Sequence, residues 1–105
     1  MNQHTSPQNN FSAALRMCRR ACSVSQEAFG VVSSRTYVSS LERGIKQPTL
    51  NKVDELAGVM GIHPLTLLAL SYLDINDPKS QEALMAVVSR ELNRVQAHSA
   101  TVERT

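Results

Sequence analysis

Apolar residues recur along this chain at helical rather than strand spacing. A stripe at intervals of three and four residues runs through Phe11, Leu15, Cys18 and Cys22, and it predicts an amphipathic helix of about three turns. Polar or structure-breaking residues then separate several further apolar stripes. The pattern therefore predicts a chain of short helices, with no alternation typical of strands.

Capping residues divide the next segment into two short helices joined by a tight turn. Ser25 followed by Glu27 predicts one helix start, because a serine accepts from free backbone NH groups and an acid suits the first turn. Ser34 predicts a second start, for a helix from Arg35 to Arg43. Gly44 then supplies the left-handed residue that ends it.

Two more helices are expected before residue 73. Thr49 can cap the first and Gly61 can end it, while Pro64 is a favourable first residue for the second. The buried positions expected in the first are Leu50, Val53, Leu56, Ala57 and Met60. Those expected in the second are Leu65, Leu67, Leu68 and Leu70.

The last part of the chain predicts one further helix. Residues 74–79 include Pro78 and are expected to be a linker, residues 80–96 the helix, and residues 97–105 a frayed tail. One side of this helix carries the stripe Leu84, Val88, Leu92 and Val95. This stripe needs cover, and pairing with a second copy is favoured over folding back onto the domain. A bundle of four such helices would give a tetramer, which the sequence leaves open beside a dimer.

Composition and charge narrow the class of protein. The 105 residues are 42% hydrophobic but only 4% aromatic, without Trp, which favours helices packed through aliphatic side chains. Residues 1–48 hold six cationic and two acidic side chains, whereas residues 49–105 hold five and seven. An anionic partner is therefore expected at the front half. The fold class expected is all-α, with residues 1–10 as a flexible arm.

Several function classes find no support in the sequence. No apolar run approaches the ~18 residues that span a membrane, and the polar N-terminus lacks a signal pattern. We therefore expect a cytoplasmic protein without a membrane partner. A metal or redox site at Cys18 and Cys22, with His4, His63 or His98, is conceivable. The cysteines instead continue the apolar stripe, and a free Cys packs as a small hydrophobe, so no cofactor or metal is expected.

Three stretches of sequence resemble a known family. Ser25-Gln26-Glu27, then Val38-Ser39-Ser40-Leu41-Glu42-Arg43-Gly44, and then Pro48-Thr49-Leu50 with Leu56-Ala57-Gly58-Val59-Met60-Gly61-Ile62 occur in the order typical of Cro/C1-type helix-turn-helix proteins, the XRE family. The resemblance covers about residues 11–71. It implies a five-helix lambda-repressor-like DNA-binding domain over residues 11–73. The chain departs from the pattern at Phe29–Ser34, where the turn is about two residues shorter and Gly30 replaces a small Ala.

The resemblance implies that the helix starting at Arg35 reads base edges in the major groove. Arg35 is the best candidate for a bidentate contact to guanine. Thr36 and Ser40 face bases in the resembling proteins, and Gln26 matches a phosphate-binding Gln. Further phosphate contacts are expected at Ser34, Tyr37, Arg43 and Lys46. The alternative is that these residues are only caps and solvated charges.

The resemblance also assigns one structural pair. Arg19 and Glu42 are expected to form an ion pair between the first helix and the end of the third. The most favoured function is a transcriptional regulator, by default a repressor, that binds double-stranded DNA as a homo-oligomer and needs no small-molecule effector. The alternative is an antitoxin-like or adaptor module that binds another protein. Nothing in the sequence indicates an enzyme, because it has no phosphate loop, paired carboxylates or nucleophile set.

Overall fold

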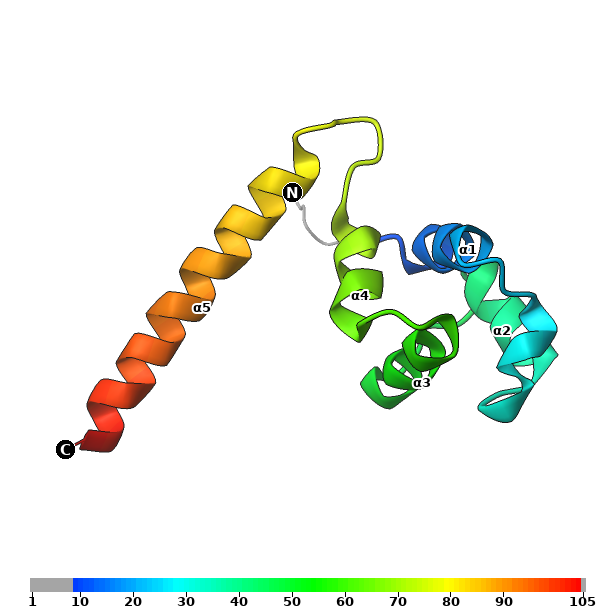
Figure 1. Cartoon of the computed structure of the whole chain (residues 1–105), viewed down its shortest axis with the longest axis horizontal. Helices are drawn as coiled ribbons and strands as arrows, with labels where there is room; N and C mark the ends of the chain where they lie inside the picture. Colours follow the sequence, from blue (N-terminus) through cyan, green and yellow to red (C-terminus); the bar gives the residue numbers. More distant parts are fainter. Residues whose placement is uncertain (1–8, 105) are drawn as a thin grey trace. The chain divides into compact units, whose positions relative to one another are not determined.

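Helices form all the regular secondary structure of the residues that the computed structural model describes, 9–104, with side chains over 9–100. In chain order they are α1 (Phe11–Ala21), the 3₁₀ helix η1 (Gln26–Val31), α2 (Arg35–Glu42), α3 (Leu50–Met60), α4 (Pro64–Tyr72) and α5 (Ser80–Arg104) (Figure 1). The all-α class and the predicted order of elements are confirmed. The chain divides after Tyr72 into two units.

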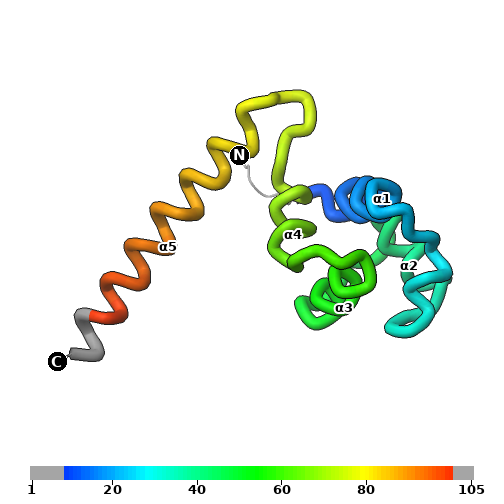
Figure 2. The backbone as a smooth tube through the Cα atoms, viewed as in Figure 1, coloured from blue at the N-terminus to red at the C-terminus, as the bar shows by residue number. Residues whose placement is uncertain are grey.

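The expected caps start three of these helices. The hydroxyls of Ser25, Ser34 and Thr49 accept from the backbone NH three residues later, at 3.2, 3.1 and 3.1 Å. Each bond satisfies a donor that has no partner inside the helix. The starts of η1, α2 and α3 are therefore fixed by local hydrogen bonds. Figure 2 shows the backbone of the turns that precede these helices.

Asn10 is a cap that the sequence pattern missed. Its Oδ1 accepts from the NH of Ala13 at 3.2 Å, and its own NH donates to the carbonyl of Ser71 at 2.6 Å. The second bond ties the start of α1 to the end of α4. Asn10 therefore belongs to the folded unit, not to the arm expected over residues 1–10, of which residues 1–8 lie outside the described part of the chain.

The core of the first unit is aliphatic, with two phenylalanines. Phe11, Leu15 and Cys18 enter it from α1, as the stripe predicted. The other buried members of this cluster are Ala14, Phe29, Val38, Leu41, Val53, Leu56, Met60 and Leu67. Every helix of the first unit contributes at least one residue to this core, so η1 and α2 pack against the same buried cluster.

Two residues expected in the core lie outside it. Leu50 is 75% exposed and Leu65 is 64% exposed. Each stands in the first turn of its helix, at the edge of the apolar stripe, and the packing of the following turns leaves both in solvent. Gly44 and Gly61 have φ of +75° and +73°, the left-handed conformation predicted for them after α2 and α3. His63 Nδ1 accepts from the NH of Leu65 at 3.0 Å and so caps α4.

The second unit consists of a turn-rich segment followed by α5. This helix continues to Arg104, beyond the expected end at residue 96. The apolar stripe stops near that point, but neither Gly nor Pro follows within the helix, so nothing local ends it. Residue 105 of the expected frayed tail lies outside the described residues.

Within the described residues no single helix is long and apolar enough to cross a bilayer, although α3 and α4 taken together, with a bend of 107° between them, have a sufficient length and apolar content. Both helices supply residues to the buried core of the first unit.

Candidate nucleic-acid interface

The leading end of α2 is exposed. Ser34 caps the helix, and Arg35 and Thr36 follow as its first two residues, all three open to solvent. Residues at spacings of three and four share a helical face. Ser39 and Arg43 therefore lie on the same side of α2 as Arg35 and Thr36, while Val38 and Leu41 point into the core.

Ser40 follows Thr36 by four residues on α2 but is buried, so it is not open to an outside partner. It is 7% exposed, and its hydroxyl donates to the carbonyl of Thr36 at 3.0 Å. At the end of α2, the backbone NH groups of Ile45 and Lys46 donate to the Ser40 backbone carbonyl. The burial of Ser40 therefore argues against the expected base contact at this residue. Ser39, which was not among the expected base contacts, is half-buried and lies near Thr36 on the open face.

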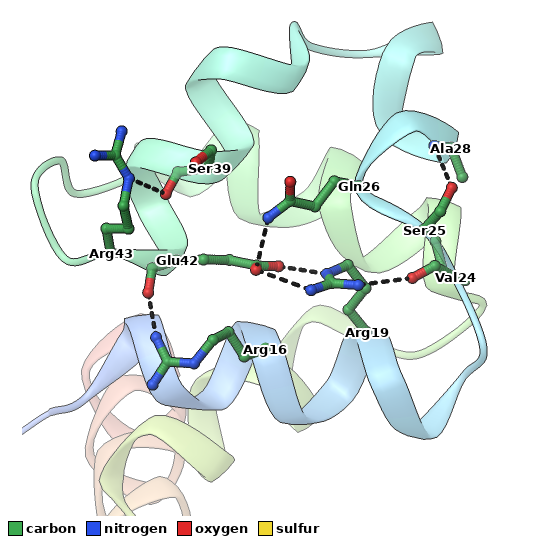
Figure 3. Close-up of polar contacts among 9 residues, drawn as sticks. All are labelled: Arg16, Arg19, Val24, Ser25, Gln26, Ala28, Ser39, Glu42 and Arg43. Carbon is green, nitrogen blue, oxygen red and sulfur yellow. Dashed lines mark hydrogen bonds and ion pairs between the residues drawn. The ribbon is translucent and has the colours of Figure 1, made fainter.

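Glu42 anchors α2 from behind. Its carboxylate accepts from Arg19 Nε at 2.5 Å and Arg19 Nη2 at 3.0 Å, and Arg19 Nη1 also donates to the carbonyl of Val24 (Figure 3). The side chains of Arg19 and Glu42 are only 15% and 4% exposed. The ion pair expected between these residues is thus present, in the two-pronged form that fixes both groups most firmly.

Two further side chains complete this cluster. Gln26 Nε2 donates to Glu42 Oε1 at 2.9 Å, and Arg16 Nη1 donates to the Glu42 backbone carbonyl. Figure 3 shows them reaching Glu42 from η1 and α1, while Arg43 points away from the cluster. The start of η1 and α1 are thereby joined to the end of α2 through Glu42. Gln26 and Arg19 bond its carboxylate, and Arg16 bonds its backbone carbonyl.

The electrostatics of the cluster follow from this geometry. Burial by itself raises the pKa of Glu42, but hydrogen bonds from Arg19 and Gln26 and the charges of Arg19 and Arg16 outweigh it, so the net pKa lies below 4.5. The hydrogen bond to Glu42 raises the pKa of Arg19. Both groups are therefore held in their charged forms.

Two lysines flank the aromatic ring of α2. Lys46 Nζ and Lys52 Nζ lie 5.7 and 5.8 Å from the ring centre of Tyr37. Lys52 also donates to the Val32 carbonyl at 2.7 Å and pairs with Glu55, so it ties α3 to the turn before α2. Lys46 is exposed and has no such second bond among the described residues. Of the two, Lys46 is the one open to an outside anion.

Arg35 has a partner across the turn. Its Nη1 lies 3.4 Å from Glu27 Oε2, and the side chains of Arg35 and Glu27 are 67% and 70% exposed. From the sequence, Glu27 was expected only to favour the start of a helix. An acid in the first turn of η1, eight residues before the leading arginine, was the available clue.

The shortened turn between η1 and α2 is closed by backbone bonds. The NH groups of Val32 and Ser33 both donate to the Phe29 carbonyl, at 2.9 and 2.8 Å. No atom would lie within 4 Å of a Cβ added at Gly30, so the replacement of Ala by Gly leaves the packing unchanged.

The cysteines occupy the core side of α1. Cys18 is 5% exposed, and burial, followed by the neighbouring Cys22, raises the pKa of its thiol. Within the described residues, no three His, Cys, Asp or Glu side chains come together in a way that could hold a metal ion.

An exposed helix end held rigidly behind a tight turn is the architecture of a DNA-binding helix-turn-helix protein. A family model described as helix-turn-helix matches residues 15–67, about half of the chain. The chain belongs to the Cro/C1-type helix-turn-helix family, also called XRE. It is therefore a DNA-binding regulator in the general sense that the family defines. Searches of curated proteins and of solved structures gave no match.

Proposed function

We propose that this protein is a transcriptional repressor that reads a palindromic operator by placing α2 in the major groove. The observation that carries the proposal is the contrast between the two ends of α2. Arg35 and Thr36 are open to solvent, while Glu42 at the other end is locked to Arg19 and Gln26. A recognition helix needs both, because base contacts depend on a fixed approach of the side chains.

Arg35 and Thr36 are the proposed base-reading residues. An arginine fork matches the O6 and N7 acceptors of guanine, and a threonine can offer a hydroxyl or contact a thymine methyl group. Ser39 lies one turn further along the same face and can extend the reading to a neighbouring base pair. All three belong to one helix, so they would contact successive bases.

Phosphate contacts would fix the register of α2. Ser34, Arg43 and Lys46 are exposed and Tyr37 is half-buried, and these residues offer hydroxyls and cations to a phosphate. The side-chain amide of Gln26 donates to Glu42. A phosphate contact at Gln26 would therefore need the amide to rotate away from Glu42, or it would use a backbone NH at the start of η1 instead. Each neutralised phosphate would steepen the salt dependence of binding by about 0.9 in log–log slope.

We propose that α5 joins two copies of the chain. Val88, Leu92 and Val95 are 39%, 55% and 60% exposed, and Leu84 precedes them on the same stripe. Two copies would remove this surface from water, and they would bring two recognition helices to half-sites one DNA turn apart, roughly 34 Å. The same stripe permits a four-helix assembly, which would bind two operators. Repression follows from occupancy, since a bound oligomer excludes other proteins from that DNA.

Selection of bound DNA from a random library, at stated salt, combined with the mass of the purified protein, tests this proposal. We expect a palindromic enriched motif and the mass of at least a dimer. Leu92→Glu should yield a monomer that binds the motif far more weakly, whereas Arg90→Glu, off the apolar stripe, should remain oligomeric. A library without any enriched motif would contradict the proposal.

The exposed stripe of α5 also favours a second candidate, an antitoxin-like or adaptor module whose α5 binds a different protein. The mass measurement separates the two. A full-length monomer in solution, with α5 helical but unpaired, would favour the second candidate. A stable homo-oligomer that buries Leu92 would leave no free stripe for such a partner.

A further inference from the structure

Glu27 stands beside the proposed base-reading arginine, and its side chain is 70% exposed. It is the only acidic residue between Ser25 and Pro48 apart from Glu42, and Glu42 is buried and paired with Arg19. The remaining charged residues of this segment are Arg35, Arg43 and Lys46. Glu27 is thus a lone exposed carboxylate on the surface proposed to meet DNA.

The contact between Glu27 and Arg35 is one-sided. Only Nη1 of Arg35 lies near Glu27, at 3.4 Å. The edge formed by Nε and Nη2 has no hydrogen-bond partner among the described residues. Two NH donors on one edge are what a guanine requires. Arg35 could therefore keep Glu27 on one side while its other edge bonds the base.

We propose that Glu27 is a positioning residue that makes Arg35 selective for a base rather than for any phosphate. This inference rests on the proposed function. On DNA without the matching guanine, the carboxylate competes with phosphate for the guanidinium and repels the backbone. On the operator, Arg35 reaches the base with Glu27 still beside it, so the competition is smaller. Glu27 thus lowers binding to random DNA more than binding to the operator.

The experiment compares the dissociation constants of the full chain for the selected operator and for a random duplex at one salt concentration. Glu27→Gln should tighten binding to the random duplex by about threefold, the size expected for loss of an exposed charge pair. Binding to the operator should change less. The ratio of the two constants should therefore fall, and the preference at one base pair should weaken.

Two further variants serve as controls for the effect of Glu27→Gln. Asp54→Asn removes the same charge from an exposed position on α3, and it should change both constants by the same factor. In an Arg35→Ala background, Glu27→Gln should leave the ratio unchanged, because the positioned side chain is gone.

Three results would overturn the inference. The ratio could stay constant in Glu27→Gln, Asp54→Asn could lower it as much, or the fall could persist without Arg35. These three results differ from failure of the proposed function. If the proposed function is wrong, the wild-type chain itself will select no motif, and the role of Glu27 will be wrong as well.

Discussion

Two ion pairs connect α2 to neighbouring elements. Both join an arginine to a glutamate, but they differ in exposure and in the number of hydrogen bonds. Arg19 and Glu42 are 15% and 4% exposed, whereas Arg35 and Glu27 are 67% and 70% exposed. The first pair is two-pronged and receives further bonds from Gln26 and Arg16. The second is a single contact at 3.4 Å.

The difference shows how one short helix serves two needs. A charge removed from water must keep its partner, so Arg19 and Glu42, the inner pair, hold α2 in one orientation. A charge left in water holds its partner weakly, so Arg35 in the outer pair with Glu27 can exchange its carboxylate for another anion. Rigid support at the rear of α2 and a free guanidinium at its front are thus obtained from the same residue types through burial alone.

The largest expected effect comes from breaking the inner pair. Glu42→Ala should lower the free energy of unfolding by ~3–5 kcal/mol, because Arg19 would be left largely buried without its partner. Urea denaturation followed by circular dichroism measures this. Asp54→Ala, an exposed acid of the same domain, serves as the control and should have little effect. A Glu42→Ala chain as stable as wild type would remove the proposed anchor.

The next effect in size is on binding, at the outer pair. Arg35→Ala should cost about 1–3 kcal/mol on the selected operator and relax the preference at one base pair, while the unfolding curve stays unchanged. Fluorescence anisotropy with operator and random duplexes measures it, with Arg20→Ala on α1 as a charge-matched control. An equal loss on every sequence would make Arg35 a phosphate contact instead.

Acid should weaken the inner pair in a defined direction. The pKa of Glu42 in the folded protein lies below its ordinary value of 4.5. The unfolded chain therefore takes up this proton first, and the stability due to Glu42 is present above about pH 4.5 and is lost as the pH falls through the folded pKa. The stability difference between wild type and Glu42→Gln should shrink from pH 7 to pH 3. A constant difference would show that ionisation of Glu42 contributes nothing.

The smallest effect is expected where the outer pair is removed from the free protein. Glu27→Ala should change the free energy of unfolding by less than about 1 kcal/mol, as for most exposed pairs. The same denaturation measurement checks this beside Glu42→Ala. A loss approaching that of Glu42→Ala would erase the distinction between the two pairs.

Local chemistry made much of this protein readable from the sequence alone. Ser25, Ser34 and Thr49 mark helix starts because each needs only a backbone NH three residues away, and Gly44 and Gly61 mark ends through their own backbone conformation. The order of these signals and the family motifs were sufficient to predict the fold class and the pairing of Arg19 with Glu42.

The tertiary structure alone decided which side chains α2 presents and what they touch. Ser40 is only 7% exposed although Thr36, one turn earlier on α2, is open to solvent, and Arg35 meets Glu27 because the turn brings η1 against the start of α2. Neither outcome follows from spacing along one helix. Both depend on how separate elements settle on a shared core, where the packing of Phe29, Val38 and Leu41 sets the rotation of α2.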